Sequence, residues 1–223
     1  MKVLAIVALL LLAVPSDEIT YTAQSVNVAE PGTPVKITIL RWSTEDERRP
    51  IVTALAAPPA QPSELAQNAA ARAGAARGRG AAGRGRGRGG AALAPLTPIA
   101  AFTAALGRVP TVGYLWTNDI TGYSIKYAWH ASLPDGTERV VLVADRRLGA
   151  YTAAWKTSTA DTDYSFTLIE LRAGPKGLIE GKTSLADKIA VDADAKTVAL
   201  DNYAAAAVSL ATASAGKRPR PSR

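Results

Sequence analysis

From residue 111 onward the chain is a series of short segments rich in β-branched and aromatic residues, separated by turn sequences such as "PDG" and "AGPKG". Segments of this length and composition are typical of β-strands. A parallel doubly wound sheet needs a helix between successive strands, and no helical pattern lies between these segments. The predicted strands are 111–117, 122–131, 138–145, 164–172, 177–184, 188–193, 196–202 and 205–213. The pattern therefore predicts an antiparallel meander.

The first half of the chain adds a hairpin and two helices. The segments "ITYTAQSVNVAE" and "VKITILRW" flank the turn "PGTP", which indicates a β-hairpin. Thr44 and Glu47 match a capping box and predict a helix start. Thr97 followed by Pro98, with Gly107 as the stop, predicts a second helix. We expect an α+β fold: a mostly antiparallel sheet of about eight strands, as a sandwich or partly closed barrel, with two helices.

Between the two predicted helices the composition changes abruptly. Residues from about 57 to 95 are almost all Ala, Gly, Arg, Pro and a few polar types, without hydrophobic periodicity. Such a segment has little to bury, so we expect a disordered insert, and the basic tail 214–223 has the same character. A chain of 223 residues suits one core. We therefore expect a single β-rich domain over 17–213, interrupted by the insert.

The N-terminus predicts export. One basic residue, Lys2, precedes an apolar run from Val3 to Val14, which is too short to span a bilayer. A secretory signal peptide over 1–16 fits this pattern, leaving no transmembrane span after cleavage. We expect a periplasmic or secreted protein. Because the chain has no cysteine, disulfides cannot stabilise it.

Four segments carry a resemblance to known sequences: "ILRWSTEDERRPIVTAL", "VPTVGYLWT", "DYSFTLIELR" and "KIAVDADAKTVALDNYAAAAVSL". Together they resemble an uncharacterised family of exported bacterial proteins with no assigned activity. The resemblance covers most of the chain outside the insert and the tail. It implies export and one β-rich domain, and it assigns no catalytic or binding residue.

The positive charge is concentrated in the insert and tail. The six arginines of the insert, the four cations of the tail and Lys2 together carry +11. Because the net charge of the chain is +7, its remaining residues carry −4. Repeated Arg and Gly can follow a phosphate backbone through counterion release. The candidate polyanion-binding residues are Arg72, Arg77, Arg79, Arg84, Arg86 and Arg88.

No aromatic residue lies between Trp42 and Phe102 to stack on bases, so we expect no specific nucleic-acid binding. Weak, non-specific contact with a polyanion or the envelope surface is one interpretation. Ala, Gly, Arg and Pro all have codons made only of G and C, so replication slippage in a GC-rich genome can also lengthen such a tract within a loop that tolerates insertions. We favour that interpretation.

Five aromatic residues on one predicted hairpin are the candidate ligand-binding residues. They are Tyr114, Trp116, Tyr123, Tyr127 and Trp129. Strict alternation places the first two on one strand face together with Val112, and the last three on one face of the next strand. Such a set can form an apolar cleft or a sugar-stacking platform. Ordinary core packing is the alternative.

The residue inventory restricts catalysis and cofactor binding. The only histidine is His130, so neither a Ser-His-Asp nor a Cys-His arrangement is expected, and His130 reads as a half-exposed strand residue. No metal site or cofactor motif is present. A hydrolase could use two carboxylates, such as Glu170 with Asp163 or Glu180.

The sequence favours a non-catalytic binding or structural module of the bacterial envelope, without a cofactor. A carboxylate-dependent hydrolase is one alternative, and a polyanion-binding protein acting through the Arg-Gly insert is the other.

Overall fold

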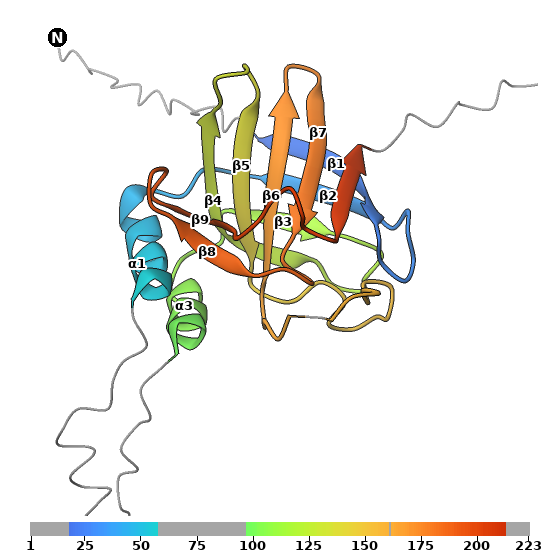
Figure 1. Ribbon diagram of the computed structural model, residues 1–223, viewed down its shortest axis with the longest axis horizontal. Helices are drawn as coiled ribbons and strands as arrows, with labels where there is room; N and C mark the ends of the chain where they lie inside the picture. The colour runs from blue at the N-terminus through green and yellow to red at the C-terminus, as the bar shows by residue number, and fades with distance from the viewer. Residues whose placement is uncertain (1–17, 58–96, 161, 213–223) are drawn as a thin grey trace, which may run out of the picture.

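The computed structural model describes residues 18–57, 97–160 and 162–212 (Figure 1). The predicted signal peptide, almost all of the predicted insert with its six arginines, and the basic tail lie outside the described residues.

Eight antiparallel strands form a closed barrel in the order β1-β10-β7-β6-β5-β4-β3-β2. This confirms the predicted α+β class and shows that the barrel is closed rather than partly closed. The order follows the chain, apart from an excursion between β7 and β10 that forms a separate sheet of β8 (Ile189–Asp192) and β9 (Thr197–Leu200). The barrel strands are β1 (Ile19–Val26), β2 (Pro34–Ile39), β3 (Gly113–Trp116), β4 (Tyr123–Ser132), β5 (Glu138–Ala144), β6 (Thr167–Gly174), β7 (Gly177–Thr183) and β10 (Ser209–Thr212).

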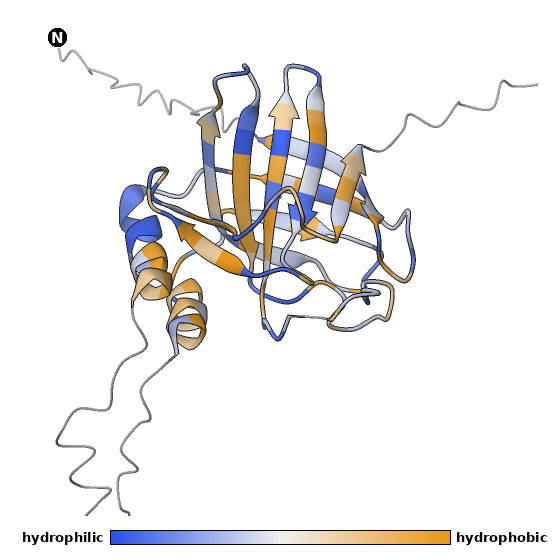
Figure 2. Cartoon of the chain, viewed as in Figure 1, coloured by the Kyte–Doolittle hydropathy of each residue, from blue (hydrophilic) through white to orange (hydrophobic). Residues whose placement is uncertain are grey.

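Inward-facing apolar side chains fill the barrel. They alternate with outward polar residues along β1 and β2, whereas most of β5 is apolar on both faces, which Figure 2 shows as a continuous orange stretch. At the end of the barrel reached by the C-terminus of β5, the segment after that strand contributes Leu148 and Trp155, which are fully buried in the same cluster. The inward set includes Tyr21, Val35, Ile37, Ile39, Leu115, Tyr123, Ile125, Val140, Leu142, Ile169, Leu171 and Leu210.

One side of the barrel is covered from outside. Helices α1 (Glu45–Ala56) and α3 (Pro98–Leu106) and the β8–β9 sheet lie over the outward faces of β4, β5 and β6 (Figure 1). They enclose a second apolar cluster that contains Ile51, Phe102, Tyr127, Val141, Val143, Phe166, Leu168, Val198 and Leu200. None of the residues in this cluster comes from β1, β2 or β3, whose outward side chains are mostly exposed. We call this bare side, β1 to β3 with the start of β4, the uncovered wall.

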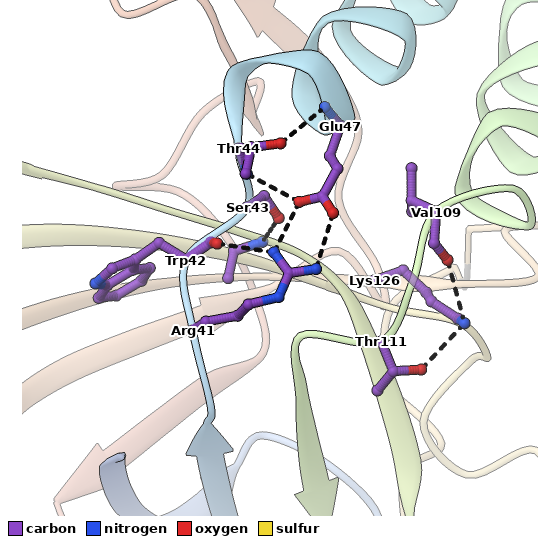
Figure 3. Close-up of polar contacts among 9 residues, drawn as sticks. Arg41, Trp42, Ser43, Thr44, Glu47, Val109, Thr111 and Lys126 are labelled. Atoms are coloured by element: carbon purple, nitrogen blue, oxygen red, sulfur yellow. Dashed lines mark hydrogen bonds and ion pairs between the residues drawn. The ribbon is translucent and has the colours of Figure 1, made fainter. Parts of the chain in front are cut away.

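The connection from β2 into α1 is fixed by polar contacts (Figure 3). The capping box predicted from Thr44 and Glu47 is present, and both guanidinium ends of Arg41 donate to the Glu47 carboxylate at 2.8 Å. Ser43 donates its amide to the Ala128 carbonyl and accepts the Ala128 amide on its hydroxyl, which joins this connection to β4. The hydrogen bond from Arg41, supported by Thr44, lowers the pKa of Glu47 to about 2.

The Glu47 contacts give a pH-dependent contribution to stability. Because its folded pKa is below the ordinary value of 4.5, the contribution is present above that value and is lost as the pH falls toward about 2. We expect Glu47→Gln to cost up to about 1 kcal/mol at pH 7, since it removes the ion pair with Arg41 while the glutamine can still complete the capping box. Urea denaturation of both proteins between pH 7 and pH 2 measures this. A difference that stayed constant over this range would contradict the assignment.

Candidate functional site

The five candidate aromatic residues occupy three different environments. Tyr123 and Tyr127 are fully buried, and Trp129 is half-buried against the outer apolar cluster. Tyr114 and Trp116, on β3, keep 41% and 49% of their surface exposed. The structure therefore leaves two of the five on the surface for contact with a ligand.

The predicted single aromatic face of β4 is wrong, because the strand contains a β-bulge. Ile125 pairs with Ala144, and the next pair is Tyr127 with Val143, so one extra residue lies between them. A bulge inverts the sides of the residues that follow it. Tyr123 therefore points into the barrel, whereas Tyr127 and Trp129 point outward under the helices and the β8–β9 sheet.

The prediction that Val112 shares a face with Tyr114 and Trp116 is also wrong. Val112 lies just before β3 and is buried in the barrel core. Its carbonyl accepts the amides of both Leu40 and Arg41, at 2.9 and 3.2 Å, so the regular alternation begins only after it. The β4 bulge has no glycine or proline at its extra residue, whereas Gly113 directly follows Val112, and a Cβ at Gly113 would clash with the Thr38 carbonyl oxygen.

On the uncovered wall, strand register arranges outward side chains in two rows. Direct cross-strand pairs give a first row of Thr20, Thr38, Tyr114 and Ser124 across β1, β2, β3 and β4. The second row runs across β1, β2 and β3 and consists of Thr22, Lys36 and Trp116. Directly opposed side chains have their Cβ atoms about 5 Å apart. Tyr114 thus lies between Thr38, which is buried, and Ser124, and Trp116 has Lys36 on its β2 side.

The exposed apolar surface of the described chain gathers along this wall. Five of the six exposed large hydrophobic residues lie on the wall or at its ends, and only Ile179 on β7 lies elsewhere. Exposed apolar groups that cluster mark interaction surfaces, whereas single ones need no explanation. The five are Leu40, Tyr114, Trp116, Ile120 and Tyr151. We call Tyr114 and Trp116 with the adjoining Ile120 and Tyr151 the aromatic strip.

The loop between β3 and β4 seats the Trp116 ring. Gly122 lies directly beneath it: a Cβ at this position would be 2.8 Å from a ring carbon of Trp116. Arg146 donates to the Gly122 carbonyl, and also to the hydroxyl oxygens of Thr121 at 3.2 Å and Tyr151 at 3.4 Å. One guanidinium therefore links the two loops that carry the ends of the strip.

The same loop is anchored from inside the barrel. The Tyr123 hydroxyl donates to the Asp119 carboxylate and accepts the Gly149 amide at 3.2 Å. Burial, together with the hydrogen bond to Asp119, raises the pKa of Tyr123 well above its ordinary value. The guanidinium of Arg146 covers the Tyr123 ring at 4.9 Å. The hydroxyl and ring of one buried tyrosine thus hold both loops of the strip.

Two of the carboxylates considered for hydrolysis, Glu170 and Glu180, lie diagonally on the neighbouring strands β6 and β7, and each is paired with a cation. Glu170 is 1% exposed, and Arg139 donates to its two oxygens at 2.8 and 3.3 Å. Glu180 pairs with Lys182 at 3.0 Å, and Asp163 lines a groove beside α3. Among the described residues, no hydrogen bond or ion pair joins Glu170 to either acid.

The Glu170 contacts instead fasten the β8–β9 sheet to the barrel. Arg139 also donates to Asp192 of β8 at 2.6 Å, and the Leu200 amide of β9 donates to Glu170 at 3.4 Å. The pKa of Asp192 is lowered by the Ala195 backbone amide and by Arg139. The sequence carries no signal for this cluster, because its members come from four strands, β5, β6, β8 and β9.

His130 is exposed, pairs through Nδ1 with Glu138, and stacks on Trp42 with ring centroids 4.0 Å apart. The described part of the chain contains no group of three or more His, Cys, Asp or Glu residues able to hold a metal ion. Its helices are too short or too polar to cross a bilayer.

Comparisons with protein-family models, with curated proteins and with solved structures found no match to this chain. The contacts and exposure described above are therefore the basis for assigning a function.

The contacts of Arg139 with Glu170 and Asp192, which we call the Glu170 clasp, predict a large effect on stability. Glu170→Gln leaves the guanidinium of Arg139 partly buried with one charge partner removed, and such a change costs about 3–5 kcal/mol. Asp46→Asn is the matched control, because it breaks an exposed pair with Arg49 and should cost less than about 1 kcal/mol. Denaturant unfolding at pH 7 gives both values, and equal losses would show that Glu170 is not a buried clasp.

Proposed function

We propose that the protein is an exported, non-catalytic binding module that recognises an extended glycan on the uncovered wall of its barrel. The observation that carries this proposal is the aromatic pair on β3, Tyr114 and Trp116, which is exposed and bordered by hydroxyl side chains. Export is proposed from the N-terminal apolar run that follows Lys2.

The chemistry of the wall suits sugars. Aromatic rings with polar tips bind the apolar face of a sugar ring, while neighbouring hydroxyls exchange hydrogen bonds with its edge. Thr20 and Ser124 lie in the row of Tyr114 and supply such hydroxyls, whereas Thr38, between Thr20 and Tyr114, is buried. Residues two apart on a strand are about 7 Å apart, so Tyr114 and Trp116 can contact successive parts of one chain.

The wall also has the rigidity that a binding surface needs. Its strands belong to a closed barrel with a filled interior, so the side chains keep their spacing without a ligand. The proposal gives no role to an acid–base pair. This agrees with Glu170 being engaged by Arg139 and lying away from the aromatic strip.

Substitution of the two strip aromatics tests the proposal directly. We expect Tyr114→Ala and Trp116→Ala each to weaken glycan binding at least tenfold, because each removes one stacking surface. Ile179→Ala is the matched control, since Ile179 is equally exposed on β7. Isothermal titration with soluble polysaccharides measures affinity, and circular dichroism checks the fold. A glycan bound equally by all four proteins would place its site elsewhere, and no glycan binding would refute the proposal.

The position of Gly122 beneath the Trp116 ring gives an independent prediction. Gly122→Ala would place a Cβ 2.8 Å from the Trp116 ring, so the exposed ring must swing away. We expect weaker glycan binding with the melting temperature changed by less than about 2 °C, because the displaced group is the end of an exposed side chain. Gly107→Ala is the control, since its Cβ would meet nothing closer than 3.6 Å. Unchanged affinity in Gly122→Ala would show that the ring position does not matter.

A further inference from the structure

We infer that the glycan is anionic and that Lys36 holds its charged substituent beside the sugar ring stacked on Trp116. This inference rests on the proposed function and narrows its ligand class. The shared chemistry is a carboxylate or sulfate group on a sugar ring.

Lys36 is placed to act together with Trp116. The two residues are directly opposed across β2 and β3, and Lys36 is exposed with Thr22 on its other side. No ion pair involves Lys36 among the described residues. Its ammonium is therefore free for a ligand, and a ring stacked on Trp116 would bring a substituent within reach of it.

The strands of the uncovered wall present positive charge without acids. Their outward positions up to the β4 bulge include Lys36 and Lys126 and no Asp or Glu. The ammonium of Lys126 contacts only neutral groups, the Val109 carbonyl at 3.4 Å and the Thr111 hydroxyl at 3.1 Å (Figure 3). The side chains of Lys36 and Lys126 thus make the strand surface of the wall cationic.

Two acids lie beside the strip: Asp145 is paired with Arg146, and Asp119 is buried with one carboxylate oxygen that has no hydrogen-bond partner among the described residues. Asp145 accepts the Ser124 amide at 3.1 Å and lies 3.6 Å from Arg146, and Asp119 is buried beneath the loop that carries Ile120. The described residues contain 15 Lys and Arg and 16 Asp and Glu, a net charge of −1, so the two lysines of the wall stand out against a body whose charges nearly balance. Such a contrast directs an anionic ligand to the wall.

The arrangement favours a charged sugar over a polyanion without rings. A polyphosphate can use Lys36 but cannot use the stacking surface of Trp116. A neutral glycan can use Trp116 but offers Lys36 only uncharged hydrogen-bond acceptors. A ring that carries an anionic group uses the stacking surface of Trp116 and forms a charged pair with Lys36.

An oligogalacturonate and its methyl ester test the inference, because the two probes share a sugar chain and differ in charge. We expect the acidic form to bind the full-length protein at least tenfold more tightly than the ester. Lys36→Gln should abolish that preference while leaving binding of the ester unchanged. Dextran sulfate against dextran forms the second pair of probes and separates sulfate from carboxylate as the substituent.

Two controls isolate the position of the charge. Lys176→Gln removes one exposed lysine from the β6–β7 turn, away from the wall, and should leave the preference intact. A variant with glutamine at the six insert arginines, from Arg72 to Arg88, should also keep it. If that variant loses binding, or polyphosphate competes as well as the sugar, the insert is the binding segment and the inference is overturned.

The two levels of the proposal fail in different ways. If Trp116→Ala abolishes binding but the acidic and esterified probes bind equally, or Lys36→Gln has no effect, the anionic assignment is overturned and glycan recognition stands. If no glycan depends on Trp116, the proposed function is overturned together with the inference.

Discussion

The pairing of β10 with β1 is the interaction on which the rest of the structure depends, because it turns a sheet with two open edges into a barrel. Closure gives the chain one sealed interior and a continuous outer surface. It requires close approach inside: a Cβ at Gly181 would lie 2.6 Å from Leu171 and 3.1 Å from Leu210. Glycine at this position lets side chains from β6 and β10 meet in the core.

Because the interior is filled, further apolar burial can occur only outside the barrel, and the sequence decides on which side. The outward residues of β4 to β6 include Tyr127, Val141 and Leu168, which the helices and the β8–β9 sheet cover. The outward residues of β1 and β2 are mainly Thr and Lys, for which burial would be costly. Helices α1 and α3 connect β2 with β3, and the β8–β9 sheet connects β7 with β10. Both therefore pack on the same side of the barrel and leave the uncovered wall to solvent.

The sequence was sufficient to predict elements formed by local interactions. The β-hairpin around "PGTP", the Thr44–Glu47 capping box and the helix from Pro98 to Gly107 each depend on neighbouring residues and are present. Features that depend on distant pairing could not be derived. The bulge near Lys126 depends on how β4 fits β5, and the Glu170 clasp joins β5, β6 and β8. Consequently the sequence could not separate the exposed Tyr114 and Trp116 from Tyr123 and Tyr127, which belong to two different apolar clusters.

The aromatic strip is distinguished from ordinary exposed residues by its connection to the core. An isolated exposed tryptophan samples several rotamers and loses entropy when a ligand fixes it. Here Trp116 lies over Gly122, whose carbonyl is held by Arg146, and Arg146 lies over the ring of buried Tyr123. The same tyrosine binds Asp119 of the loop. The loop that positions the surface ring is thus fixed by a side chain of the barrel interior, which reduces the ordering that binding would otherwise require.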